Sequence, residues 1–140
     1  MKAITLWQPW ASFVARGLKV YETRSWDTPY RGWLAIHAAQ RVPADVVELC
    51  RAEPFAFWLK MMGCTVEELP RGVVVCKVRL LRTFRAGSES VNPFDLQFGD
   101  FSEGRFAWVF GAIASYPTPI PARGQQGLWE WDEPGGVSHV

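Results

Sequence analysis

The ten residues Gly17-Leu18-Lys19-Val20-Tyr21-Glu22-Thr23-Arg24-Ser25-Trp26 carry three charged side chains within six positions. Upstream of them, Phe13, Val14 and Gly17 recur at three- and four-residue intervals, which predicts a helix that closes at Gly17, a residue suited to a left-handed C-terminal cap. From Lys19 to Trp26 the residues favour a strand. The stretch therefore predicts a helix that turns directly into a strand.

Side chains two residues apart in a strand share a face, so Glu22, Arg24 and Trp26 are expected to point the same way. Lys19 has the opposite parity, and we expect it either in the turn or at an irregular first residue of the strand, from where its long side chain can reach Glu22. In a cleft, burial would lower the pKa of Lys19 and the carboxylate would raise it. A charged Lys19 would bind phosphate or a carbonyl oxygen, and a neutral one would act as base or nucleophile. The alternative is an ion network that only holds the corner in place.

Hydrophobic periodicity outlines the rest of the chain. We expect strands over Ala3–Trp7, Trp33–Ala39, Gly72–Phe84, Arg105–Ser115 and Gly127–Trp131, helices after Pro43 and from Pro54 to Met62, a loop over Ala86–Gly104 that covers a site, and an extended connection at Pro117, Pro119 and Pro121. Strands outnumber helices, and no linker or repeat is visible. The pattern predicts an α+β fold, a small mixed β-barrel with flanking helices, as one domain over residues 1–140.

Composition limits the possible functions. Apolar runs are too short to cross a membrane, and the N-terminus has no apolar secretory segment, so we expect a cytoplasmic protein. Cys50, Cys64 and Cys76 fit neither a disulfide framework nor a zinc site, and His139 is a poor second ligand beside His37. We therefore expect reduced thiols, no metal and no cofactor.

Charge and aromatic content favour a local binding site. The net charge is only +1, so any site for phosphate must concentrate its cations locally. Eight Trp and nine Phe in 140 residues exceed the needs of a small core, which places some rings at a cleft wall. Trp10, Trp26 and Tyr30 are the candidates for stacking on a base.

Four more residues are candidate contacts: His37, Lys77, Arg79 and Arg105. His37 lies on an apolar strand and is either a hydrogen-bonded interior histidine or a ligand contact. Lys77, Arg79, Arg82 and Arg85 form the densest basic run, in which Lys77 and Arg79 share an exposed face and either follow a phosphate backbone or are only solvated. Arg105 either lines the cleft or anchors the loop before it.

Several segments resemble one known family. They are Leu6–Ser12, Gly17–Trp26 with an intact G-x-K-x-x-E-x-R core, Tyr30–Gly32, Ile36–Ala39, Phe98–Phe101, Gly104–Trp108 and Pro121–Trp129. Together they resemble the ASCH family, named for homology to an activating signal cointegrator. The resemblance implies a fold like that of pseudouridine-synthase-and-archaeosine-transglycosylase (PUA) domains, a β-barrel with flanking helices, and roles with RNA or as a coactivator.

The resemblance leaves three hypotheses for function. The first is a PUA-like module whose cleft around Lys19, Glu22 and Arg24 binds RNA, another single-stranded nucleic acid or a nucleoside. The second is a cofactor-independent hydrolase of RNA or a modified nucleoside. Some small bacterial relatives hydrolyse 4-acetylcytidine with a Lys, a Thr three residues later and a downstream carboxylate; Lys19 matches the Lys, but Glu22 stands where the Thr is. In that case Lys19 is base or nucleophile, and Glu22 accepts a proton or orients Lys19. The third is a protein-interaction module in transcription.

Overall fold

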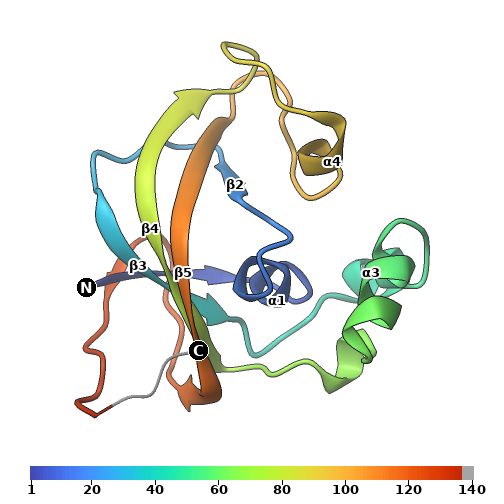
Figure 1. The fold of residues 1–140 in the computed structure, drawn as a ribbon, viewed down its shortest axis with the longest axis vertical. Helices are drawn as coiled ribbons and strands as arrows, with labels where there is room; N and C mark the ends of the chain where they lie inside the picture. Colours follow the sequence, from blue (N-terminus) through green and yellow to red (C-terminus); the bar gives the residue numbers. More distant parts are fainter. Residues whose placement is uncertain (137–140) are drawn as a thin grey trace.

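One six-stranded sheet bends around a short central helix (Figure 1). The computed structural model describes residues 1–136, so His139 lies outside the described residues. The strands are β1 (Lys2–Leu6), β2 (Tyr21–Arg24), β3 (Gly32–Ala38), β4 (Val73–Arg85), β5 (Phe106–Pro121) and β6 (Trp129–Glu130). The helices are α1 (Trp10–Ala15), α2 (Ala44–Cys50), α3 (Phe55–Met62), the 3-10 turn η1 (Val66–Glu68) and α4 (Pro93–Leu96).

The strand order is β2-β5-β4-β3-β1-β6, in which β1 and β3 are parallel and the other pairs antiparallel. The predicted α+β, PUA-like fold is confirmed with one difference. Within residues 1–136, no backbone pairing joins β2 to β6, so the curved sheet does not close into a barrel. The end strands are short, because β2 has four residues and β6 pairs only with Lys2 and Ala3.

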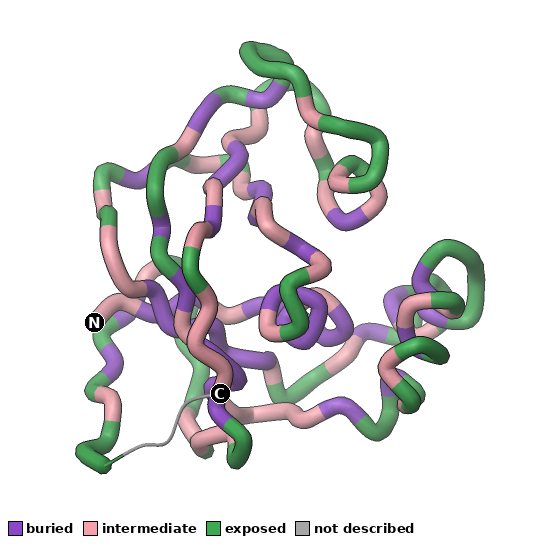
Figure 2. The backbone as a smooth tube through the Cα atoms, viewed as in Figure 1, coloured by how far each residue is buried: buried purple, intermediate pink, exposed green. Residues whose placement is uncertain are grey.

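Helix α1 lies between the sheet and the pair α2 and α3, and Figure 2 shows it among the most buried segments. Its Ala11 and Val14 belong to the core cluster of the sheet, whereas Phe13 belongs to a second cluster with Phe55 and Phe98. One short helix thus packs on two sides, because its apolar residues surround it instead of forming a single stripe.

The turn after α1 sets the position of Lys19. Gly17 has a positive φ of 77°, and the amides of Leu18 and Lys19 both donate to the Phe13 carbonyl, at 2.9 and 3.1 Å. This is a helix C-terminus closed by a left-handed glycine, as predicted. The strand begins only at Tyr21, so Lys19 lies in the turn.

Strand β4 does not alternate regularly between its two faces. Cys76, Val78 and Leu80 lie in the core beneath the sheet, but Val74 packs in another cluster with Ala3 and Trp129. A register shift between Val74 and Cys76 turns Val75 into the core instead. Bulges of this kind change which face a side chain occupies.

Two other expectations differ in detail. The segment predicted as a loop contains α4, whose first turn is capped by Asn92, since its side chain accepts the Asp95 amide at 3.0 Å. The proline segment belongs to β5: between the pairs Cys76↔Ser115 and Val74↔Ile120, β5 has four residues where β4 has one. Because Pro117 and Pro119 lie in this irregular section, their missing N–H groups interrupt no regular ladder.

Candidate functional site

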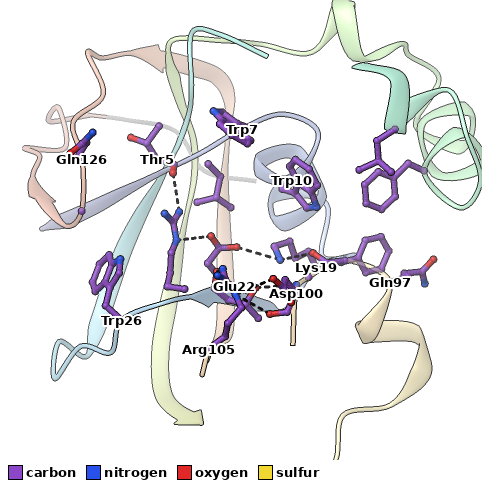
Figure 3. A pocket seen from close by; sticks show the side chains of 18 of the residues that line it. Thr5, Trp7, Trp10, Lys19, Glu22, Trp26, Gln97, Asp100, Arg105 and Gln126 are labelled. Atoms are coloured by element: carbon purple, nitrogen blue, oxygen red, sulfur yellow. Dashed lines mark hydrogen bonds and ion pairs between the residues drawn. The ribbon is translucent and has the colours of Figure 1, made fainter. Parts of the chain in front are cut away.

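A cleft of about 980 Å³ opens beside the end of β1, at the edge strand β2 (Figure 3). This volume is at the upper end of the range of small-molecule sites. The sheet side of the wall includes Thr5, Trp7, Glu22, Arg24 and Trp26; the helical side includes Trp10, Leu49 and Phe55; and two loops contribute Gln97–Asp100 and Gln125–Gly127. The cleft lies where the two ends of the curved sheet fail to meet.

Three charged side chains meet at the cleft. Lys19 Nζ lies 3.3 Å from Glu22 Oε1, and Arg24 Nε lies 2.8 Å from Glu22 Oε2, so each carboxylate oxygen faces one cation. Glu22 and Arg24 share a face of β2, and Lys19 reaches Glu22 from the turn. The structure brings these three predicted residues together; their role in binding stays a prediction.

Lys19 is the most deeply buried of the three, with a side chain only 2% exposed. Its Nζ also donates to the Phe98 carbonyl at 2.8 Å, which ties the loop before β5 to the cleft. Burial lowers the pKa of Lys19, and the nearby Glu22 carboxylate opposes this by favouring the ammonium. The Lys19 side chain thus holds the loop in place through a hydrogen bond and also lines the cleft.

Arg24 is the more open cation, with a side chain 24% exposed. Its Nη2 donates to the Thr5 carbonyl at 3.0 Å while its Nε faces Glu22. Two of its nitrogens are therefore fixed, and Nη1 lies outside both contacts. A guanidinium held in this way presents its remaining N–H groups to a ligand in a defined orientation.

The aromatic candidates separate into two groups. Trp10 and Trp26 line the cleft, Trp10 edge-on to Phe55 and Trp26 edge-on to Trp108 at a centroid distance of 5.0 Å. Tyr30 is not among the lining residues: its ring packs against the core and its hydroxyl donates to the Trp33 carbonyl. The two tryptophans are therefore the predicted rings that a ligand can contact.

Arg105 also lines the cleft, at the start of β5. Its Nη2 donates to the Thr23 carbonyl at 2.9 Å and its Nε to the Asp100 carbonyl at 3.1 Å. It therefore anchors the loop before β5 onto β2 from within the wall. Four acidic residues lie between β4 and β5: Glu89, Asp95, Asp100 and Glu103. Asp100 is the one of these that lines the cleft.

His37 lies outside the cleft wall and is buried. Its Nε2 is 2.7 Å from the Ala122 carbonyl, which can only accept, so the neutral ring carries its hydrogen on Nε2. Its Nδ1 then accepts from the Thr5 hydroxyl at 3.2 Å. Burial lowers the pKa of His37, which favours this neutral form. The residue supports the wall from behind.

Lys77 and Arg79 lie on the other face of the sheet and do not reach the cleft. Both stack on Trp33, with Lys77 Nζ at 4.9 Å and the Arg79 guanidinium at 4.6 Å from the ring centroid. Lys77 also pairs with Glu133 at 3.1 Å. Their role as phosphate contacts stays a prediction, separate from the cleft.

Some wall residues were not predicted as site residues. They include Thr5 and Trp7 near the N-terminus and the rim Gln125–Gly127. The rim is more than 100 residues away in sequence from the other two, so no local pattern links them. The Trp7 side chain is half exposed, as expected for a ring that contacts a ligand. Its position at the end of an apolar strand made it look like a core residue in the sequence. The segments that resemble the family include Trp7, Phe98–Asp100 and the rim, which was the available sequence signal.

Residues 1–136 contain no cluster of three or more His, Cys, Asp or Glu side chains that could hold a metal ion. No helix within these residues is both long and apolar enough to cross a membrane. The absence of a metal or cofactor, the cytoplasmic location and the single domain stay predictions.

Comparison with known proteins gives the family. The family model for the ASCH domain matches residues 4–115. The chain is 31% identical to human Activating signal cointegrator 1 and 30% identical to the mouse protein of that name, in alignments of 137 positions that cover 92% of this chain and 22% of the relative. It therefore spans about a fifth of the length of these relatives.

Two solved structures are similar as well. Crystal structures of an ASCH protein from Zymomonas mobilis and of its tyrosine-to-phenylalanine variant have TM-scores of 0.45 and 0.46 and identities of 15% and 17%. Both alignments cover 86% of this chain, and 72% and 74% of the respective structures. The family model alone covers most of the sequence, and the chain belongs to the ASCH family.

Proposed function

We propose that the cleft around Lys19, Glu22 and Arg24 binds an unpaired RNA base or a modified nucleobase. Membership of the ASCH family supports RNA binding at the general level. The observation that carries the finer proposal is a fixed guanidinium, Arg24, paired with a carboxylate in an aromatic-walled cleft.

The chemistry of the wall suits a base better than an aliphatic ligand. Trp7, Trp10 and Trp26 offer aromatic surface, and base–aromatic stacking contributes about 1–3 kcal/mol per base. Arg24 Nη1 offers donors to a ring nitrogen or carbonyl oxygen, and the Glu22 carboxylate can accept from an exocyclic amino group. RNA proteins commonly read unpaired bases through such combined stacking and edge contacts.

The test is binding of short single-stranded RNA oligomers of each base to wild type and to Arg24→Ala, by fluorescence anisotropy. We expect saturable binding by wild type, weakened by about tenfold or more in the variant, because a hydrogen bond to a charged group contributes about 1.5–3 kcal/mol. Arg51→Ala is the charge-matched control: Arg51 is exposed, pairs with Glu48 and lies outside the cleft wall. Equal affinities for the two variants would refute the proposal.

A second candidate function is hydrolysis of an acylated base such as 4-acetylcytidine. The observation that favours it is Lys19, whose pKa burial lowers and which lines the cleft beside a carboxylate. A lysine that loses its proton more readily is a better base or nucleophile. Against it, the ammonium is held by both Glu22 and the Phe98 carbonyl.

Turnover separates the two candidates. The protein is incubated with 4-acetylcytidine and with labelled RNA, and products are followed by chromatography. Turnover by wild type that disappears in both Lys19→Met and Glu22→Gln, while Arg51→Ala retains it, supports the hydrolase. Saturable RNA binding without any product supports the binding function and argues against the hydrolase.

A further inference from the structure

The sheet register places a second arginine on the same face as the cleft. Arg85 of β4 lies directly opposite Phe106 of β5, and Phe106 lies directly opposite Arg24 of β2. Residues directly opposite each other in antiparallel strands point to the same face. Arg85, Phe106 and Arg24 therefore form one row across three strands, next to the row Thr83–Trp108–Glu22 on that face.

The neighbouring contacts agree with this assignment. The Arg85 guanidinium lies over the Phe106 ring at 5.3 Å from its centroid. Tyr21 and Phe84, whose rows alternate with these, contact each other on the opposite face at a centroid distance of 6.0 Å. Two spacings between adjacent strands separate the Arg85 and Arg24 backbones, which is about 10 Å.

Arg85 also has fewer interaction partners than Arg24. It is exposed, and within residues 1–136 its guanidinium has neither an ion pair nor a hydrogen bond, whereas Arg24 faces Glu22 and Thr5. Other charges near this end include Arg31, which contacts Thr83 Oγ1 at 3.3 Å, Asp27, whose carboxylate accepts from the same hydroxyl at 2.7 Å, and Arg105, which is held by the Thr23 and Asp100 carbonyls. Stacking on Phe106 orients the guanidinium while leaving its N–H groups in solvent, a geometry that suits phosphate.

We propose that Arg85, on Phe106, is a phosphate subsite for a single nucleic-acid strand whose base enters the cleft at Arg24. The subsite rests on the proposed function, and it adds the direction in which the backbone leaves the cleft, across β5 toward β4. A free base or nucleoside in the cleft does not reach it. Arg85 therefore contributes to the affinity for a strand and not to that for an isolated nucleoside.

Arg82 provides a matched control. It lies three residues before Arg85 on the same strand, and its guanidinium stacks on Phe84 at the same 5.3 Å. Its row lies on the opposite face of the sheet, where it pairs with Glu89 at 2.7 Å. The two arginines thus share residue type, strand and aromatic contact, and differ in the face they occupy and in the ion pair that, among the described residues, Arg82 alone of the two makes.

The experiment measures affinity of Arg85→Ala, Arg85→Lys and Arg82→Ala for a short single-stranded RNA and for the matching nucleoside, over a series of salt concentrations. For Arg85→Ala we expect RNA binding weaker by about three- to tenfold and a salt slope reduced by about 0.7, the value for one phosphate contact on a single strand. Nucleoside affinity should not change. Arg85→Lys should keep the slope, and Arg82→Ala should match wild type.

The outcomes separate the two proposals. If wild type binds both ligands and Arg85→Ala equals Arg82→Ala, the subsite is refuted and the cleft stands. If Arg85→Ala weakens the nucleoside as much as the RNA, the residue acts on the cleft itself and the subsite is again refuted. If wild type binds neither ligand, both proposals fall.

Discussion

The Arg24 guanidinium donates to the Thr5 main-chain oxygen at 3.0 Å, across the gap between the two ends of the curved sheet. Arg24 lies on β2, an edge strand, and Thr5 lies on β1 beyond the two residues, Lys2 and Ala3, that β6 pairs with. A side chain thus bridges the place where backbone pairing stops. The cleft opens at this bridge because no strand within residues 1–136 fills the gap.

Removing the bridge should destabilise the fold. Arg24→Ala deletes one hydrogen bond and one charge contact of a largely buried carboxylate, so we expect the free energy of unfolding to fall by about 1–3 kcal/mol. Urea denaturation measures it. The exposed Arg51→Ala should change stability by less than about 0.5 kcal/mol, because exposed ion pairs contribute little. Equal effects of the two variants would contradict the bridging role.

Lys19 gives a prediction in the alkaline range. Its pKa in the folded chain is lowered from the usual 10.5, mainly by burial, so the unfolded chain holds this proton to higher pH than the folded chain does. Stability from this residue should therefore rise with pH in the window below 10.5. The unfolding free energy of wild type minus that of Lys19→Met should increase from neutral pH to about pH 10. A difference that stays flat or falls contradicts the lowered pKa.

The exposed Lys60 on α3 controls for loss of a lysine as such. Lys60→Met should leave the unfolding free energy at neutral pH nearly unchanged, because exposed substitutions usually fall within about 0.5 kcal/mol. Lys19→Met should not, since it removes the tie to the Phe98 carbonyl and leaves that acceptor without its donor.

His37 gives a prediction for stability in the acidic range. Burial lowers its pKa from 6.5, so on acidification the unfolded chain takes up this proton first. Stability should therefore be lost as pH falls below about 6.5, down to the folded pKa. Denaturant unfolding between pH 7.5 and about pH 5 should show wild type losing stability faster than His37→Gln. Parallel pH curves for the two proteins would rule out a buried neutral His37.

Gly124 tests how closely the cleft rim packs on that histidine. An added Cβ would lie 2.8 Å from His37 Cε1 and 3.0 Å from Thr5 Oγ1, so Gly124→Ala must displace the ring or the rim. Overpacking of this kind costs about 1–3 kcal/mol. We expect a lower melting temperature and weaker RNA binding. Gly135→Ala is the control, since nothing lies within 4 Å of its added Cβ, and it should melt like wild type.

Local sequence determined the central part of the site. The three-residue offset from Lys19 to Glu22 and the two-residue offset from Glu22 to Arg24 were enough to predict that these side chains meet, because a helix end and a strand fix side-chain directions over short distances. The glycine that ends α1 was predictable for the same reason. Both depend only on backbone geometry within about ten residues.

Tertiary structure decided how the charges are partnered and where the sheet ends. The basic run of β4 appears continuous in sequence, yet the register shift between Leu80 and Arg82 leaves Arg79 and Arg82 on one face, and the regular alternation that follows puts Arg85 on the other. Thr5 and Phe98 join the site through carbonyl oxygens, which no side-chain pattern encodes. Whether a sheet closes depends on strand lengths and pairings summed over the chain, so the open edge that forms the cleft became visible only in the folded molecule.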